Sequence, residues 1–258
     1  MEDFGLVSII TPSYNSSRFI SDMIESVMRQ TYTNWELLIT DDCSTDNSCE
    51  IINEYVKIDS RIRLFILEEN SGAGIARNNS IRHAQGRFMA FLDSDDMWMP
   101  EKLQRQLSYM IKYSYKLTYT SYMLIDELDA ITGIVVSPRK QSFFANKCDD
   151  KVGFSTAIYD VVSIGKKYLP AIRKRQDWGL IMDILREVKM AYGLKEPLGY
   201  YRKGQESLSK NKLSLIKYNI AAYKSVLGWS SFKAYAFFCV FFIPSHIVKV
   251  LALRYINR

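Results

Sequence analysis

Histidine and closely spaced cysteines are scarce in this sequence. Its 258 residues include two histidines, His83 and His246, and four cysteines whose spacing fits no paired metal-binding pattern. These shortages argue against a zinc site, because such sites take most of their ligands from cysteine and histidine. We therefore expect reduced thiols and a cytosolic chain.

Long apolar runs, internal repeats and low-complexity tracts are also missing. The most apolar segment, residues 234–243, is followed by Pro244 and is shorter than the roughly 20 residues that a transmembrane helix requires. The first residues carry no basic stretch of the kind that opens a signal peptide, so we expect no such peptide.

The composition is that of a folded protein with a basic balance. Hydrophobic residues make up 48% and charged residues 24%, which fits one large α/β domain, with or without an appendage. The net charge of +6 favours an anionic partner: a nucleic acid, an anionic membrane surface or a phosphorylated substrate. A nucleic acid fits least well, because the basic residues are scattered and do not alternate with aromatic residues in one stripe. We therefore expect no nucleic-acid partner.

Strand-like and helix-like segments alternate in the first half of the chain. Apolar runs at residues 6–10, 35–39, 61–67 and 88–92 are each followed by a segment with helical spacing, which predicts a mostly parallel sheet up to about residue 113. Further along we expect two strands within residues 117–136 and a polar loop at 137–153. The turn between those strands is expected near Thr132 and Gly133, a helix at about residues 179–189, and a short strand at 198–201.

The fourth apolar run ends in three carboxylates, Asp93, Asp95 and Asp96. Ionised carboxylates at the rim of a core repel one another and lose hydration, so packing alone does not favour them. A divalent cation such as Mg²⁺ or Mn²⁺ removes the conflict, since it takes oxygen ligands and shares them with substrate phosphates. The alternative is an acidic loop that caps the helix after Pro100.

Polar clusters follow each of the four predicted strands. They comprise residues 12–15, Asp41 with Asp42, residues 70–72, and residues 93–95. In open α/β sheets, ligands bind at the carboxyl ends of the strands, where these clusters would meet. The sequence therefore predicts a nucleotide-binding edge.

Four stretches in this order resemble the inverting glycosyltransferases of family 2, which have the GT-A fold. They are residues 7–15 (VSIITPSYN), 41–46 (DDCSTD), 70–78 (NSGAGIARN) and 93–96 (DSDD), and the resemblance spans about residues 5–210. Residues 176–178 (QDW), 200–202 and 207–209 further resemble bacterial members that build O-antigen, capsule or teichuronic acid.

The resemblance implies an α/β fold with a mixed sheet flanked by helices. Residues 1–212 would form the GT-A domain, with the donor-binding part at about 5–113 and the acceptor side at about 114–212. Residues 213–258 would form a helical extension. Its apolar segment and following basic residues favour an interfacial membrane helix; the alternative is a helix buried in the core or in a dimer contact.

The resemblance also implies roles for individual residues. Asp41 would accept a hydrogen bond from the uracil ring, and Arg77 would reach the same base or form a salt bridge to Asp41 or Asp42. Asp95, with Asp93, would hold Mn²⁺ or Mg²⁺ against the diphosphate. The residues expected to bind the donor nucleotide are Pro12, Tyr14, Asp41, Asp42, Gly72, Arg77, Asp93 and Arg202.

On the acceptor side, Asp177 would be the general base, although an aspartate in the first turn of a helix also stabilises the helix dipole. Gln176 and Trp178 would contact the acceptor or the sugar, and Trp178 has a core position as its alternative. Gly204 stands where many relatives have histidine, so the diphosphate contact of that residue would fall to Arg202 or Lys203.

These features together predict a metal-dependent, inverting hexosyltransferase. The donor would be a UDP-sugar and the acceptor an undecaprenyl-diphosphate-linked saccharide, at the cytoplasmic face of a bacterial inner membrane. The alternative is an inactive GT-A-like protein that binds a nucleotide sugar or glycan; the presence of both Asp95 and Asp177 favours the enzyme. The sequence does not determine which hexose is transferred.

Overall fold

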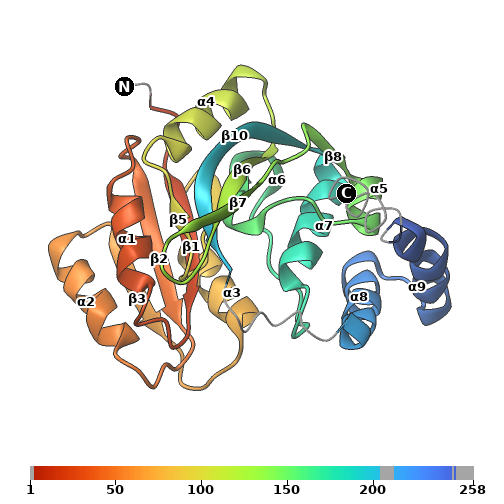
Figure 1. Ribbon diagram of the computed structural model, residues 1–258, viewed down its shortest axis with the longest axis horizontal. Coiled ribbons are helices and arrows are strands. Elements are labelled where there is room, and N and C mark those ends of the chain that lie inside the picture. Colours follow the sequence, from red (N-terminus) through yellow and green to blue (C-terminus); the bar gives the residue numbers. More distant parts are fainter. Residues whose placement is uncertain (1–2, 204–211, 246, 248–258) are drawn as a thin grey trace.

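The computed structural model describes residues 3–203, 212–245 and 247 (Figure 1). Its first half consists of parallel strands joined by helices, as the alternating pattern predicts. Strand order is β3-β2-β1-β4, with every neighbouring pair parallel. The elements are β1 (Val7–Ser13), α1 (Ile20–Met28), β2 (Trp35–Asp41), α2 (Ser48–Ile58), β3 (Ile62–Ile66), α3 (Ala73–His83) and β4 (Phe88–Phe91).

The second half extends the same sheet with antiparallel neighbours, so that the whole sheet is mixed. β9 runs antiparallel to both β4 and β6, β10 runs parallel to β6, and β5 pairs with the outer side of β10. The added elements are β5 (Met97–Trp98), α4 (Lys102–Lys112), β6 (Leu117–Ile125), β7 (Ile131–Val135), β8 (Lys140–Ser142), α5 (Phe143–Cys148), η1 (Phe154–Thr156), β9 (Ile158–Asp160), α6 (Val161–Ile164), α7 (Gln176–Val188) and β10 (Met190–Arg202).

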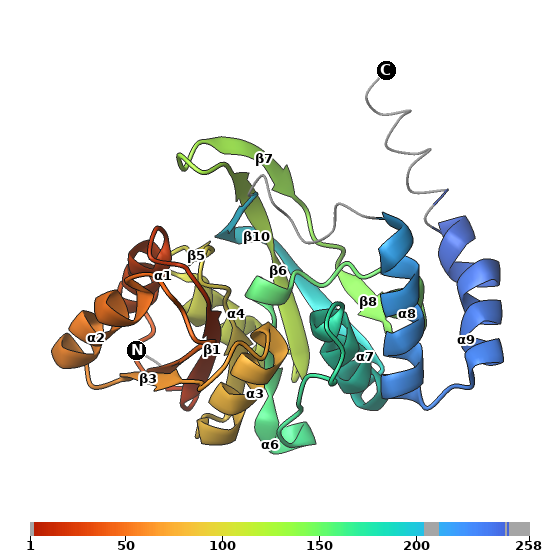
Figure 2. The same ribbon diagram turned by 90° about the horizontal axis from the view of Figure 1, so that it is seen from below.

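Helices cover both faces of the sheet because strand side chains alternate in direction. Val7 and Ile9 of β1 pack with α1, α2 and α4 in one core cluster, whereas Ile10 packs with α3 and α7 in the other. Figure 2 shows α1 and α2 on one side of β1, and α3 and α7 on the other. Because β1 is parallel to both β2 and β4, the carboxyl ends of these three strands lie at one edge of the sheet.

Three expectations about the second half were wrong. The turn of the β6–β7 hairpin lies at residues 126–130, where Asp126 Oδ1 accepts the N–H groups of Leu128 and Ala130 and Asp129 has φ 64°. Gly133 lies inside β7 and pairs with Leu124. Residues 137–153 contain β8 and α5 instead of a loop, and β10 is much longer than the predicted strand at 198–201.

Of the C-terminal helices, α8 (Lys212–Leu227) packs against α7, and α9 (Ser231–Phe237), which leads into the π-helical turn η2 (Phe238–Phe242), packs against α8. Ala234 and Phe238 are buried in a cluster with Trp178, Met182 and Tyr223. This inner face of the extension therefore belongs to the core, which agrees with the alternative prediction of a buried helix. None of the helices in the described part of the chain has the length and apolar character needed to cross a membrane.

Lys102, in the first turn of α4, is completely buried. Its Nζ has no hydrogen-bond partner among the described residues and lies 3.5 Å from the centre of the Trp98 ring. Burial holds the pKa of this amine well below its usual value. The folded state thus disfavours a proton that the unfolded chain binds at every pH below about 10.4.

We predict that Lys102→Met stabilises the protein. Methionine keeps the contact with Trp98 and removes a buried polar group, so unfolding at pH 7 should require about 1–3 kcal/mol more free energy. The gain should shrink as the pH rises toward 10, because the unfolded lysine then loses the same proton. Thermal unfolding at pH 7 and 9.5 measures it, with the exposed Lys112→Met as control. A variant less stable than wild type at both pH values would contradict the prediction.

Candidate active site

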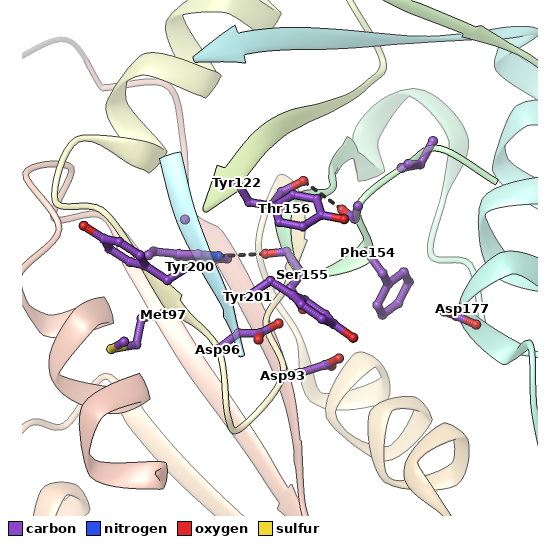
Figure 3. A pocket seen from close by; sticks show the side chains of 14 residues that line it. Asp93, Asp96, Met97, Tyr122, Phe154, Ser155, Thr156, Asp177, Tyr200 and Tyr201 are labelled. Atoms are coloured by element: carbon purple, nitrogen blue, oxygen red, sulfur yellow. Dashed lines mark hydrogen bonds between the residues drawn. The ribbon is translucent and has the colours of Figure 1, made fainter. Parts of the chain in front are cut away.

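A pocket of about 200 Å³ opens where the β4–β5 loop, the end of β10 and the start of α7 meet (Figure 3). Carboxylates and aromatic rings line most of it. In the view of Figure 3, Asp177 approaches from α7 on the far side of the Phe154 ring from Asp93 and Asp96. The lining residues are Asp93, Asp96, Met97, Trp98, Tyr122, Val152, Gly153, Phe154, Ser155, Thr156, Asp177, Gly199, Tyr200 and Tyr201.

The three carboxylates after β4 have different surroundings. Asp93 is partly exposed and forms a salt bridge with Arg77. Burial, followed by the charge of Asp93, raises the pKa of Asp95 to about 6. Asp96 is 1% exposed, its Oδ1 accepts the N–H of Arg202 at 2.9 Å, and burial raises its pKa well above the usual value. Three carboxyl groups are therefore crowded at the end of a buried strand, where burial disfavours the charged forms of Asp95 and Asp96.

This acidic loop has the donor type that Mg²⁺ and Mn²⁺ prefer, namely carboxylate oxygen. Among the described residues, however, no three histidine, cysteine, aspartate or glutamate side chains are grouped so as to hold a metal by themselves. A cation at Asp95 and Asp93 would need further oxygen ligands, which the phosphates of a bound nucleotide can supply. The residues fit a metal shared with a ligand and do not form a complete metal cage.

Two arginines flank the acidic loop. Arg77 pairs with Asp93, and not with Asp41 or Asp42 as its alternative role proposed. Arg202 has a side chain only 2% exposed; Nη1 lies 2.6 Å from Asp129 Oδ1, and Nε donates to the Asp95 carbonyl at 3.0 Å. Arg77 Nε and Arg202 Nη2 are buried without a hydrogen-bond partner in the described structure.

Asp41 and Asp42 at the end of β2 are both buried and hydrogen-bonded within the protein. Asp41 accepts three hydrogen bonds, one from the Ser13 hydroxyl at 2.8 Å and two from Ser44. Asp42 accepts the N–H groups of Ser71 and Gly72, each at 2.7 Å, and so fixes the start of α3. These carboxylates shape the edge of the sheet, and direct contact with a nucleotide stays a prediction for both.

The remaining residues expected at the donor side lie at the same edge. Pro12 is buried in β1, and Gly72 is the N-cap of α3, with φ 94°, a backbone conformation that glycine adopts without strain. Tyr14 lies just beyond β1 and is 50% exposed, so its ring is free to stack on a base. The structure thus brings the predicted donor residues to one edge of the sheet.

At the start of α7, Asp177 faces the pocket but Trp178 does not. Trp178 is 1% exposed, donates from Nε1 to the Asn146 carbonyl at 2.8 Å, and packs edge-on against Tyr223. The prediction that it offers a face to a sugar was therefore wrong, and its alternative as a core residue holds. Gln176 lies against Gly74 of α3, where a Cβ atom would come within 2.6 Å of Gln176 Cδ.

Several site residues carried no readable signal in the sequence. Asp150 lies in the segment expected to be a loop, and its Oδ1 accepts hydrogen bonds from Asn146 Nδ2 at 2.9 Å and from the Val152 N–H at 3.2 Å. Burial, followed by the charge of Asp177, raises the pKa of Asp150 to about 7. The aromatic pocket residues Tyr122 and Phe154 were also missed, because distant segments bring them together, whereas Tyr201 belongs to the motif at residues 200–202.

The chain is similar to known proteins along most of its length. The profile of glycosyl transferase family 2 matches residues 8–155. TuaG of Bacillus subtilis (strain 168), named for teichuronic acid biosynthesis, is 39% identical over 222 residues, covering 86% of this chain and 88% of its own. WfgD of Escherichia coli, a UDP-Glc:alpha-D-GlcNAc-diphosphoundecaprenol beta-1,3-glucosyltransferase, is 39% identical over 218 residues, covering 84% of each chain.

Solved structures share the fold at lower sequence identity. TarS of S. aureus, residues 1–349 in complex with UDP-GlcNAc, superposes with a TM-score of 0.68 and 19% identity. The match covers 88% of this chain and 69% of that one. At this identity the likeness concerns the fold, which is the mixed, helix-flanked sheet described above.

Proposed function

The chain belongs to glycosyl transferase family 2, and we propose that it transfers a hexose from a UDP-sugar to an undecaprenyl-diphosphate-linked saccharide. The observation that carries this is one pocket in which the acidic loop after β4 and Asp177 of α7 meet. The names of TuaG and WfgD support a place in bacterial surface polysaccharide synthesis, and WfgD supports glucose as the first hexose to test.

The donor nucleotide occupies the edge formed by β1, β2 and α3. Tyr14 stacks on the base, the loops held by Asp41 and Asp42 shape its pocket, and Asp93 lies nearest the ribose and diphosphate. Asp95, together with Asp93, would hold Mn²⁺ or Mg²⁺, and a cation bound there would neutralise negative charge on the leaving diphosphate. Arg77 Nε and Arg202 Nη2, which are buried without a hydrogen-bond partner among the described residues, favour the same anion. Residues 5–113 thus form the donor part, and residues 114–212 the acceptor side.

Asp177 acts as the general base on the opposite side of the pocket. It takes the proton of the acceptor hydroxyl as that oxygen attacks the anomeric carbon. The bond from the anomeric carbon to the UDP oxygen breaks, and its electron pair stays on UDP. Attack from the face opposite the leaving group inverts the anomeric centre, so an α-linked donor gives a β linkage. Gln176 lies next to the base, near the acceptor.

A second face of the C-terminal helices supports peripheral attachment to the cytoplasmic face of the inner membrane. Phe232 is 85% exposed, Val240 61% and Ile243 38%, at spacings that place them on one side of a helix. Burying such side chains in the acyl boundary stabilises the bound state. The basic residues expected to assist, Lys249, Arg254 and Arg258, lie outside the described residues.

A panel of UDP-sugars tests the proposed reaction. With Mn²⁺ and undecaprenyl-diphosphate-linked GlcNAc, we expect UDP release from one donor well above the rate of donor hydrolysis.

Asp95→Ala should abolish this metal-dependent turnover, because the carboxylate that holds the cation is gone. Near-normal kcat with unchanged dependence on Mn²⁺ would show that Asp95 is not a metal ligand. Binding of a UDP-sugar without turnover by the wild type would favour the non-catalytic alternative.

Asp177→Asn tests the base. The amide preserves shape but cannot accept the proton, so kcat should fall by a factor of the order of 10²–10⁴ while Kd for UDP with Mn²⁺ stays nearly unchanged. Steady-state kinetics and calorimetry measure the two quantities. A weaker Kd with kcat preserved would assign Asp177 to binding instead.

The membrane contact is tested on the exposed face, because removal of residues 230–258 would also strip Ala234 and Phe238 from the core. Phe232→Ser/Val240→Ser/Ile243→Ser should weaken binding to vesicles containing anionic lipid by about 100-fold, if each of the three side chains contributes about 1 kcal/mol. The control carries Ile58→Ser/Ile66→Ser/Val162→Ser, three exposed apolar side chains on α2, β3 and the start of α6. Equal vesicle binding by both variants would rule out the face that carries Phe232, Val240 and Ile243 as the membrane contact.

A further inference from the structure

Helix α3 makes contacts on both sides of the site, and the roles proposed above for Gly72 and Arg77 do not account for all of them. Its start is fixed by Asp42, and Arg77 forms the salt bridge with Asp93 in the acidic loop. Gly74 and Asn78 are four residues apart and so lie on one face of the helix; Gly74 lies against Gln176, the first residue of α7, and Asn78 bonds to Leu169 in the segment before α7. One helix therefore touches both the acidic loop and the approach to Asp177.

Asn78 makes a matched pair of hydrogen bonds with the backbone of Leu169. Its Nδ2 donates to the Leu169 carbonyl at 3.0 Å, and its Oδ1 accepts the Leu169 N–H at 2.8 Å. The side-chain amide thus satisfies both polar groups of a buried residue that lies 91 positions away along the chain. Apart from asparagine and the longer glutamine, no side chain carries an amide that offers this donor and acceptor together.

The segment held by Asn78 touches α7 next to the proposed base. The ring of Pro170 packs on Gly179, where a Cβ atom would lie 2.6 Å from Pro170 Cγ. On the other side of Asp177, Gln176 packs on Gly74 of α3. Close contacts therefore lie on both sides of Asp177. Gln176 packs on Gly74 of α3, and Gly179 packs on Pro170, the residue that follows Leu169.

We propose that Asn78 is a positioning residue for Asp177. By anchoring Leu169 it holds Pro170 against the first turn of α7, and so keeps the Asp177 carboxylate in the pocket with Asp93 and Asp96. The adjacent Arg77 ties the same helix to the acidic loop, which links the placement of the base to the donor site. The inference rests on the proposed role of Asp177 as general base.

Asn78→Ala tests this with a comparison of kcat and donor affinity. A base displaced by a fraction of an ångström to 1 Å should lower kcat for UDP-glucose and the lipid-linked acceptor by about 10–100-fold. Kd for UDP with Mn²⁺ should stay unchanged, because no donor contact is removed. Asn79→Ala is the matched control: it lies on the same helix and donates to Thr40 Oγ1 in β2 at 3.2 Å. Its kcat should equal that of wild type.

A double mutant separates positioning from general stability. If Asn78 acts through Asp177, then Asn78→Ala should lower kcat in the wild type but produce no further loss in the Asp177→Asn background. Multiplied losses, a wild-type kcat for Asn78→Ala, or an equal loss in Asn79→Ala would overturn the proposal. If Asn78→Ala does not fold, Asn78→Asp keeps the shape and the acceptor for the Leu169 N–H, and the same comparison applies.

The outcome also distinguishes this inference from the proposed reaction. If wild type turns over and Asp177→Asn does not, while Asn78→Ala is fully active, the reaction stands and the positioning role is wrong. If Asp177→Asn retains full kcat, the base assignment is wrong and the positioning role fails with it. Thermal unfolding of each variant confirms that the compared proteins are folded.

Discussion

The site depends on how the protein offsets the unfavourable burial of the carboxyl groups that follow strand β4. Asp95 and Asp96 carry raised pKa values because burial and mutual repulsion disfavour their charged forms. The balancing groups come from distant parts of the chain: Arg77 from α3, and the backbone and side chain of Arg202 from the end of β10. These contacts tie α3, the end of β4 and the end of β10 to a single site.

The acceptor side is built differently, from packing. Trp178 and Tyr223 anchor the C-terminal helices to α7. At the start of α7, Gln176 packs on Gly74 of α3, and Pro170 packs on Gly179. The two kinds of interaction meet at α3, which carries an ion pair on one residue and a backbone anchor on the next. A pocket between a charged loop and a packed helix start suits a reaction in which an anion leaves and a proton is removed opposite to it.

Much of the site could be predicted from local signals. A carboxylate after an apolar strand is visible in the sequence, and parallel topology brings several such strand ends together, so Asp41, Asp93 and Asp95 lie at one edge as expected, while their roles stay predictions. Predictions that depended on whether a side chain is buried were not reliable. Trp178 next to Asp177 looked equally suited to sugar and core, and only its position under α8 and α9 decided for the core. The hairpin turn was misplaced because Asp126 supplies the turn hydrogen bonds, whereas Gly133 pairs inside a strand.

The sequence by itself determined the family, the parallel half of the sheet and the acidic edge, because these follow from short motifs and from period-two and helical patterns along the chain. Only the tertiary structure decided which charges pair, which aromatic rings line the pocket, and that Asp150 and Asn78 lie near the start of α7. The physical reason is distance along the chain: the Asn78–Leu169 contact spans 91 residues and Arg202 reaches Asp96 across 106. No local pattern encodes such contacts, since they form only when distant segments pack together in the folded protein.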